Sequence, residues 1–317
     1  MTQTFERDRF TWLAYLFLAF YGFFLNVLGP ITPFLKSELN LSYTISSLHF
    51  TAFAVGILLV GLGGGRLIER VGRWRALWIG ASGMSLSVLL LLAGKTPVLT
   101  IGASFLMGLV GSLILAIVPS ALSDRHGEMR AVAFVEANLV TSLVVTSAPL
   151  MVGWFAHTIG NWRLALAIVA VAPILMYLGF RKISLPTTIS TPQNQTQARQ
   201  PLPGLFWVFW ATIILAVSAE FCIVFWSADY LENVLRLAKA DATQAVSFFF
   251  VGMVLGRMAG SRLAQRFSAP HVVTASVLVA SIGFLAFWQA RIAALGLGGL
   301  LVIGLGIANL YPLLLSL

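Results

Sequence analysis

The stretch FAVGILLVGLGGGRLIER, residues 53–70, recurs later in the chain as FFVGMVLGRMAGSRLAQR, residues 249–266. The two stretches lie 196 residues apart and are identical at eight positions. In the first copy these are Phe53, Val55, Gly56, Leu59, Gly64, Arg66, Leu67 and Arg70, and in the second Phe249, Val251, Gly252, Leu255, Gly260, Arg262, Leu263 and Arg266. Shared apolar composition explains a few matches, but not two glycines and two arginines in register. The second part of the chain is therefore predicted to be a copy of the first, as in many duplicated membrane proteins.

The composition indicates that the protein lies in a lipid bilayer. Of 317 residues, 59% are hydrophobic and 10% are charged, whereas about a quarter of the residues of a soluble domain are charged. The net charge of +9 does not indicate nucleic-acid binding, because the basic residues sit in short gaps between apolar runs rather than on one soluble face. The single cysteine, Cys222, excludes a disulfide framework and a thiolate metal site.

Ten apolar runs are long enough to cross a membrane as helices, which takes about 20 residues. They are too long and too uniformly apolar for the strands of a membrane barrel. We expect the helices at 11–34, 44–65, 76–94, 97–122, 131–155, 163–180, 204–230, 240–262, 271–290 and 292–317.

The distribution of Lys and Arg predicts that the N-terminus is cytoplasmic, because cytoplasmic loops carry the excess of these residues. With that orientation the inner segments hold thirteen Lys and Arg residues and the outer segments hold six. The localisation expected is the plasma (inner) membrane, crossed several times.

A polar segment divides the chain into two domains. The residues 184–203 are rich in Pro, Thr and Gln, which is typical of a linker. We expect a six-helix bundle over 1–183, a cytoplasmic linker over 184–203 and an incomplete second bundle over 204–317. A weaker echo pairs Gly111 and Pro119 with Gly304 and Pro312, so that the fourth helix corresponds to the tenth.

The segment after the first copy, GRLIERVGRWR at residues 65–75, resembles the signature loop of the major facilitator superfamily, G-x-x-x-D-R-x-G-R-[KR]. The matching residues are Gly65, Arg70, Gly72 and Arg73, with Glu69 in the place of the usual Asp and Arg75 as a further basic residue. A glycine permits a tight turn, arginines hold the loop at an anionic membrane surface, and the carboxylate can meet a helix N-terminus.

The resemblance implies an all-α integral membrane protein of two six-helix bundles related by a pseudo-twofold axis, with about 10 of 12 helices present. It also implies a secondary transporter that works by alternating access. The sequence departs from the family pattern at Ser104, where proton-coupled members often have Arg. The residues Ala148, Pro149 and Gly153 are similar to a degraded antiporter motif, and packing or bending of the helix at Pro and Gly is the favoured interpretation.

Polar residues inside apolar runs are the candidate functional residues, because they are costly in a membrane and usually face a cavity. Glu220 is the most central carboxylate, and the resemblance places its helix at the central cavity as a coupling or substrate residue; a structural carboxyl is the alternative. His49 is a candidate proton site, or else a satisfied polar residue. The candidate substrate ligands are Asn26, Asn309 and Tyr311, with helix packing as the alternative.

Two further groups of charges have competing interpretations. In this superfamily the fifth and eighth helices face each other, so Glu136 and Arg257 are candidates for a gating ion pair. The cluster Asp124, Arg125, His126 and Glu128 resembles a metal or acid–base site in composition, but its position in a loop favours a solvated segment that sets the topology.

The function expected is transport of a small molecule, with proton coupling as an option and efflux slightly favoured over metabolite uptake. A non-transporting sensor or scaffold with the same fold is the alternative. An enzyme, a cofactor, a metal and nucleic acid are not expected, and the partners are the lipid bilayer, the substrate and H⁺, with the protein a monomer. Because the copy stops two helices short, we expect a fragment that does not transport alone and that lacks about 70–80 further residues in two more spans.

Overall fold

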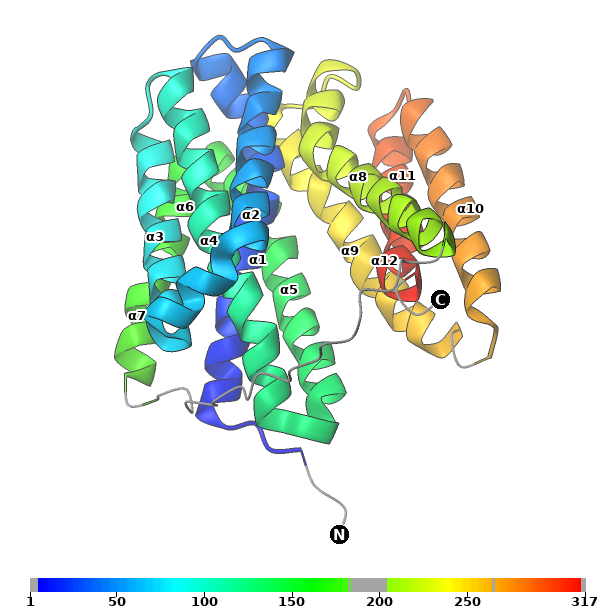
Figure 1. Ribbon diagram of the computed structural model, residues 1–317. Coiled ribbons are helices and arrows are strands. Elements are labelled where there is room, and N and C mark those ends of the chain that lie inside the picture. Colours follow the sequence, from blue (N-terminus) through cyan, green and yellow to red (C-terminus); the bar gives the residue numbers. More distant parts are fainter. Residues whose placement is uncertain (1–4, 182, 184–203, 264–265, 315–317) are drawn as a thin grey trace. The chain divides into compact units, whose positions relative to one another are not determined.

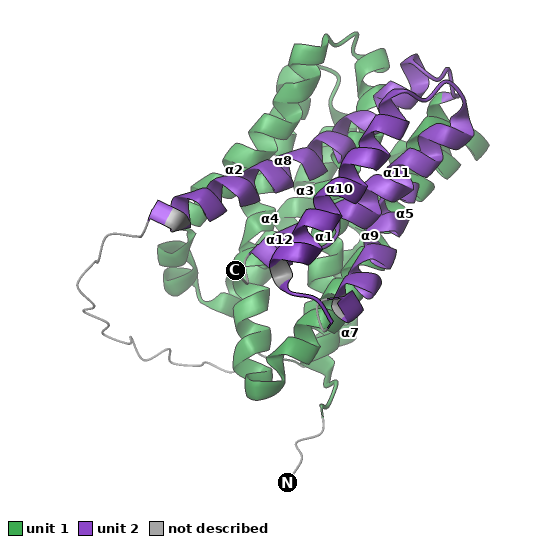
Figure 2. Cartoon of the chain, turned by 90° about the vertical axis from the view of Figure 1, so that its right-hand side faces the viewer, with its two compact units in different colours: residues 1–186, 239–244 green, residues 187–238, 245–317 purple. Residues whose placement is uncertain are grey.

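The computed structural model describes residues 5–181, 183, 204–263 and 266–314, and all regular elements in these ranges are helices (Figure 1). The linker expected over 184–203, and Gln265 in the second copy of the repeat, lie outside these ranges. The chain forms two compact units (Figure 2). Unit 1 comprises 1–186 and 239–244, and unit 2 comprises 187–238 and 245–317.

The helices of unit 1 begin and end close to the predicted positions. They are α1 (Arg9–Glu38), α2 (Tyr43–Val71), α3 (Arg73–Ala93), α4 (Pro97–His126), α5 (Arg130–Thr158), α6 (Arg163–Ala170) and α7 (Ala172–Phe180), with a short 3₁₀ turn, η1 (Gly127–Met129), between α4 and α5. The helices of unit 2 are α8 (Gly204–Asn233), α9 (Lys239–Leu263), α10 (Ala269–Trp288), α11 (Ala293–Ile307) and α12 (Leu310–Leu314). The first residues of α9 belong to unit 1.

These helices account for the ten predicted spans. In the described residues, nine stretches are long and apolar enough to cross a membrane, and one of them, Pro97–Thr158, contains both α4 and α5. Two predicted spans are each broken into two helices. The break at Val171 precedes Pro173 at the start of α7, and the break before α12 precedes Pro312. Proline causes such breaks because it has no N–H and its ring clashes with the preceding turn.

The core of unit 1 is α1, whose side chains are buried along most of its length. Phe17, Phe23 and Phe24 are each at most 1% exposed. Phe24 packs edge-to-face against Phe20 and Phe23, with ring centroids 5.1 and 5.2 Å apart. Because aromatic side chains bury large areas, this helix provides the surface on which α4 and α5 pack.

The repeat in the sequence is also a repeat of one helix contact. In unit 1, α2 meets α4 where a Cβ on Gly108 would overlap the Phe53 carbonyl, and a Cβ on Gly56 would overlap the Phe105 carbonyl. In unit 2, α9 meets α11 where a Cβ on Gly304 would overlap the Phe249 carbonyl.

The fourth member of this set is Gly252, where a Cβ would overlap the Leu301 carbonyl. Each glycine and each carbonyl of unit 2 lies 196 residues after its counterpart in unit 1, the same offset as the sequence repeat. These contacts support the predicted correspondence of α2 with α9 and of α4 with α11. The predicted pairing of Gly111 with Gly304 is wrong by three residues, because Gly111 faces Met84 and Tyr21, and Gly108 makes the contact that Gly304 repeats.

We predict that adding one methyl group at either contact destabilises the protein. Gly108→Ala or Gly304→Ala should lower the free energy of unfolding by about 1–3 kcal/mol, because overpacking forces the backbones apart. Gly102→Ala in α4 and Gly298→Ala in α11 are the matched controls, since a Cβ at these positions meets nothing within 4 Å. Thermal unfolding of the purified protein in detergent measures the effect. Equal melting temperatures for the test and control variants would contradict the importance of these contacts.

Candidate functional site

Glu220 and Arg257 form an electrostatic pair within unit 2. Glu220 lies in α8, 16 residues after Gly204 and 13 before Asn233, and Arg257 lies in α9, 6 residues before Leu263. The two side chains interact with each other through their charges, and Glu220 is partly exposed while Arg257 is exposed. Both residues belong to membrane-spanning helices. A charge inside a membrane-spanning helix is unfavourable in free energy unless an opposite charge lies nearby. Each of the two residues provides this opposite charge for the other.

Glu136 has a different set of partners. Arg7 donates two hydrogen bonds to its carboxylate, from Nε at 2.9 Å and from Nη2 at 2.6 Å, and the Tyr15 hydroxyl donates a third at 3.2 Å. A bidentate Arg–carboxylate pair is a strong and directional contact. The gating pair of Glu136 with Arg257 would join residues of the two units and stays a prediction, and the partners found for the two residues are Arg7 and Glu220.

His49 is buried between α2 and α4. Its Nε2 lies 2.8 Å from the Thr100 hydroxyl and its Nδ1 lies 3.2 Å from the Ser46 carbonyl. Because a carbonyl can only accept, we assign the ring proton to Nδ1, and Nε2 then accepts from Thr100. Both ring nitrogens are therefore satisfied inside unit 1, which agrees with the alternative of a structural histidine.

The candidate substrate ligands make contacts typical of helix packing. Asn26 donates to the Gly22 carbonyl one turn earlier at 2.9 Å. Asn309 sits at the break between α11 and α12 and donates to the Gly256 carbonyl of α9 at 2.7 Å. Tyr311 is 49% exposed. The roles of these residues in substrate binding stay predictions, and Asn309 also stabilises the contact between α9 and α11.

The signature loop is a tight turn fixed to the end of α4. Gly72 ends α2 and precedes α3 with φ of 88°, a conformation that favours glycine. Arg73 donates to Asp124 at 2.7 Å and to the Ser120 hydroxyl at 2.5 Å. Other motif residues are exposed on the surface: Gly65, Glu69, Arg70 and Arg75.

Arg125 and His126, which lie in the last turn of α4 and not in a loop as predicted, hold the start of α1. Asp8 caps α1 by accepting from the backbone N–H of Thr11 at 2.8 Å and from its hydroxyl at 2.7 Å. Arg125 donates to the other Asp8 oxygen at 2.7 Å, and His126 lies 2.8 Å from the Thr11 hydroxyl. The cluster that resembled a metal or acid–base site thus makes structural contacts.

The charge of Asp8 is stabilised by these contacts. Partial burial opposes ionisation, but the Thr11 donors and the Arg125 guanidinium outweigh it and lower the pKa of Asp8 below its ordinary value. Sequence reasoning did not identify this contact. A signal was present, because an Asp directly before an apolar helix is a typical N-cap, but nothing in the sequence pattern identifies Arg125 as its partner.

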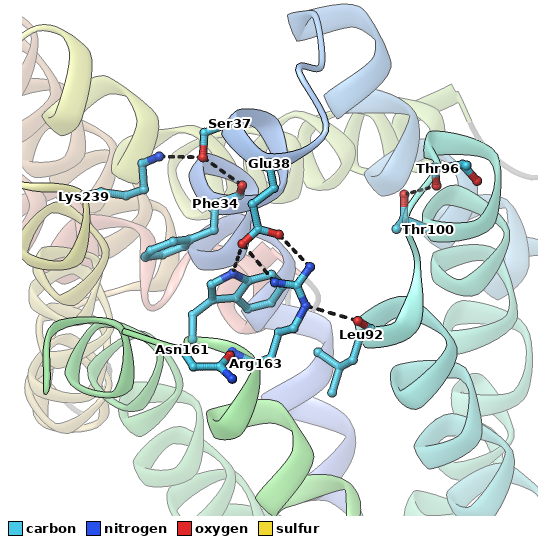
Figure 3. A network of polar contacts seen from close by, with 10 residues as sticks. Phe34, Ser37, Glu38, Leu92, Thr96, Thr100, Asn161, Arg163 and Lys239 are labelled. Carbon is cyan, nitrogen blue, oxygen red and sulfur yellow. Dashed lines mark hydrogen bonds and ion pairs between the residues drawn. The ribbon is translucent and has the colours of Figure 1, made fainter. Parts of the chain in front are cut away.

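A second polar network lies at the opposite end of α1 (Figure 3). Arg163 donates to both oxygens of Glu38, at 2.9 and 2.6 Å, and to the Leu92 carbonyl at 3.1 Å. The Trp162 indole donates to Glu38 at 2.8 Å. These bonds join the ends of α1 and α3 to the start of α6.

The same network includes the first residues of α9 that belong to unit 1. Lys239 donates to the Ser37 hydroxyl at 2.7 Å, and Thr243 donates to the Pro30 carbonyl at 3.3 Å. The side chain of Gln244 and the carbonyl of Ala240 occupy the space beside Gly153 of α5. One helix, α9, therefore begins in contact with α1 and α5 of unit 1 and continues in unit 2.

Substitutions of Asp8 can separate the stability that comes from its helix cap from the stability that comes from its charge. Asp8→Asn should keep the cap, since Asn caps helices as well as Asp, whereas Asp8→Ala should cost about 1 kcal/mol more. Because the pKa of Asp8 is lowered in the folded protein, the stability from its charge is present above the ordinary pKa of about 4 and is lost as the pH falls further.

Thermal unfolding measured between neutral and acidic pH tests both points. The difference in melting temperature between wild type and Asp8→Asn should shrink as the pH falls below about 4. Arg125→Gln should be non-additive with Asp8→Asn. A constant difference at every pH would show that the Asp8–Arg125 pair contributes no stability.

Comparison with known proteins gives one family and several distant relatives. The model of the family described as Major Facilitator Superfamily matches residues 13–317. The glucose/mannose transporter GlcP of Bacillus subtilis is 23% identical in an alignment of 324 residues that covers 94% of this chain and 78% of that protein. Multidrug resistance protein 1 of the same organism is 29% identical over 188 residues, covering 58% of this chain and 46% of that protein.

Solved structures show the same fold. A crystal structure of a D-xylose-proton symporter matches with a TM-score of 0.74 at 16% identity, over 97% of this chain and 81% of that one. At such identity the match supports the arrangement of the helices, and the substrate has to be argued from this chain's own residues.

Proposed function

Because the chain belongs to the Major Facilitator Superfamily, we propose that it is a secondary transporter in which Glu220 and Arg257 couple proton movement to substrate movement by alternating access. The observation that carries the proposal is the electrostatic interaction of these two residues within membrane-spanning helices. A secondary transporter of this kind needs no cofactor, since an ion gradient supplies the driving force.

The charge pair provides a physical route to coupling. With Glu220 ionised, the charges of the pair cancel, and the site is tolerated in an apolar medium. When Glu220 takes up a proton from one side, Arg257 loses its attraction to the Glu220 carboxylate, and its position in the membrane becomes less favourable. The protein then favours a state in which Arg257 reaches water or a polar group of the substrate. Release of the proton to the other side restores the pair and completes the cycle.

The start of α9 is proposed as the contact that opens and closes during this cycle. It is bonded to α1 through Lys239 and Thr243, while the same helix carries Arg257 further along. Separation of Lys239 from Ser37 would therefore move the helix that holds one partner of the charge pair. Coupling in this form needs no long pathway, because the same helix carries both features.

We propose efflux of a weakly polar or amphipathic compound as the direction and substrate class, with metabolite uptake as the second candidate. The membrane-spanning helices hold few charges, and the chain has 23 Phe, 9 Trp and 8 Met, residues that suit adaptable apolar contacts. Among the relatives, one is named for multidrug resistance and another for glucose and mannose, so both classes belong in a substrate screen.

The first test is Glu220→Gln, which keeps the shape of the side chain and removes its titratable charge. We expect substrate flux into proteoliposomes that contain the purified protein to collapse or to lose its dependence on pH. Glu128→Gln, the same change at a surface carboxylate outside the charge pair, is the matched control and should leave flux unchanged. An unchanged pH profile in Glu220→Gln with normal expression would make Glu220 a structural residue.

The pairing itself is tested by stability. Arg257→Gln leaves Glu220 without its partner and should lower the melting temperature, because an uncompensated charge in an apolar site is costly. The double variant Glu220→Gln/Arg257→Gln should regain part of this loss, since neither charge then remains. Additive losses in the double variant would contradict the pair.

The substrate screen also distinguishes the two candidate functions. If the protein is stable and monodisperse but transports no compound in the screen, the sensor or scaffold is favoured.

The movement of α9 is tested by reversible cross-linking. In a Cys222→Ser background, Ser37→Cys and Lys239→Cys are joined with a short bis-methanethiosulfonate reagent. We expect flux to stop on cross-linking and to return on reduction, because the contact can no longer open. The single variant Ser37→Cys treated in the same way is the control. Full flux in the cross-linked protein would show that this contact does not open during transport.

A further inference from the structure

A cavity of about 560 Å³ lies between α9, α10 and α11, within unit 2. Its lining is mostly apolar and includes Leu263 at the end of α9, Phe267 between α9 and α10, and Val279 from α10. The polar lining residues are His271, Ser276 and Asn309. Leu263, Phe267 and Val279 are 43%, 56% and 38% exposed, so the cavity opens on the outer surface of membrane-spanning helices. Its volume falls in the range of sites that hold small ligands.

The repeat indicates that this side of the three helices faces lipid. The counterparts of Ala259, Leu263 and Ala275 in unit 1, 196 residues earlier, are Gly63, Leu67 and Ile79. Leu67 and Ile79 are 48% and 51% exposed, and a Cβ on Gly63 would meet nothing within 4 Å. These positions are open although α5, α6 and α7 are present in unit 1. The repeat therefore leaves these three positions open in unit 1, whereas the counterparts of Val272 and Asn309, which are Ala76 and Leu113, are 1% and 3% exposed.

The charge around the cavity has one sign. The sequence from residue 242 to residue 317 contains no Asp or Glu. Arg266 directly precedes the lining residue Phe267, and His271 lines the cavity at the start of α10. Arg262, four residues before Arg266 in the sequence, is exposed, as is Arg266. This end of α9 is the end that the Lys and Arg distribution predicts to be cytoplasmic.

The N-terminus of α10 adds a fixed positive potential at the same place. The hydroxyl of Ser268, the N-cap residue, lies 2.6 Å from His271 Nδ1 and makes no capping bond to the helix backbone. Pro270 has no N–H group, and the N–H groups of His271 and Val272 donate to the Ser268 carbonyl at 3.1 and 3.2 Å. The positive potential at this end therefore comes from the dipole of α10, which favours an anion nearby.

We propose that this cavity is a binding site for an anionic phospholipid. One acyl chain lies in the apolar part between α9, α10 and α11, and the phosphate lies at Arg266, His271 and the N-terminus of α10. Basic pockets between membrane helices on the cytoplasmic side bind anionic headgroups in this way. The lipid would fill the space beside the Asn309–Gly256 hydrogen bond. It would thereby stabilise the packing of α9 on the broken helix pair α11 and α12.

The test uses the purified protein in nanodiscs that contain a trace of photoactivatable phosphatidylglycerol with a diazirine in the acyl chain. We expect the label on peptides from α9 and α10, several times more strongly than with phosphatidylcholine of the same chains. Arg266→Gln should weaken phosphatidylglycerol labelling about fivefold, because each basic residue near an anionic lipid surface contributes to binding to that extent. Arg291→Gln, which removes a charge beside α11 at the opposite end, should have no effect.

A second pair of variants separates the acyl chain from the headgroup. Ala259→Trp fills the cavity and should abolish labelling by both lipids, whereas Leu278→Trp, at an exposed residue of α10 outside the lining, should not. Equal labelling by the two lipids, or unchanged labelling in Arg266→Gln, would overturn the proposal of an anionic lipid. Displacement of the label by an amphipathic compound that the protein transports would identify the cavity as a substrate site instead.

Discussion

Close backbone approach at paired glycines is the interaction on which both units depend. In lipid, apolar side chains gain little by leaving their surroundings, so helices associate through close packing at small residues. Gly56 and Gly108 allow α2 and α4 to touch through their backbones, and Gly252 and Gly304 do the same for α9 and α11. Each contact holds its pair of helices together, and in unit 1 both α4 and α5 also pack on α1.

Charge pairing is the second constraint, and it determines where the polar residues can be. At the ends of the helices of unit 1, ion pairs connect elements distant in sequence, such as Asp8 with Arg125 and Glu38 with Arg163. These pairs are partly exposed and contribute little stability individually, but they determine where the ends of α1 lie. Glu220 and Arg257 differ because they pair within membrane-spanning helices. A charge pair inside the membrane costs free energy of desolvation that an apolar pair at the same position would not cost. This cost is the physical reason to assign Glu220 and Arg257 a function.

The fold was predictable because its determinants are local. Helix limits follow from apolar length, the turn at Gly72 follows from glycine, and the duplicated contact was visible as a repeat at residues 53–70 and 249–266. The partners of the charged residues were not predictable, because each bond joins residues far apart in sequence. Glu136 pairs with Arg7 across 129 residues, and no periodicity carries that information. The predicted pairing of Gly111 with Gly304 was wrong by three residues for a related reason. Spacing alone did not show that Gly108, and not Gly111, is the counterpart of Gly304.

The central claim is that Glu220 and Arg257 link proton movement to substrate movement. This link is tested by following the pH inside proteoliposomes that contain the protein and the trapped dye pyranine, while a transported compound is added outside. The account predicts that the luminal pH changes as the compound crosses and that the change requires the substrate gradient. Flux of the compound with no change in luminal pH would contradict it.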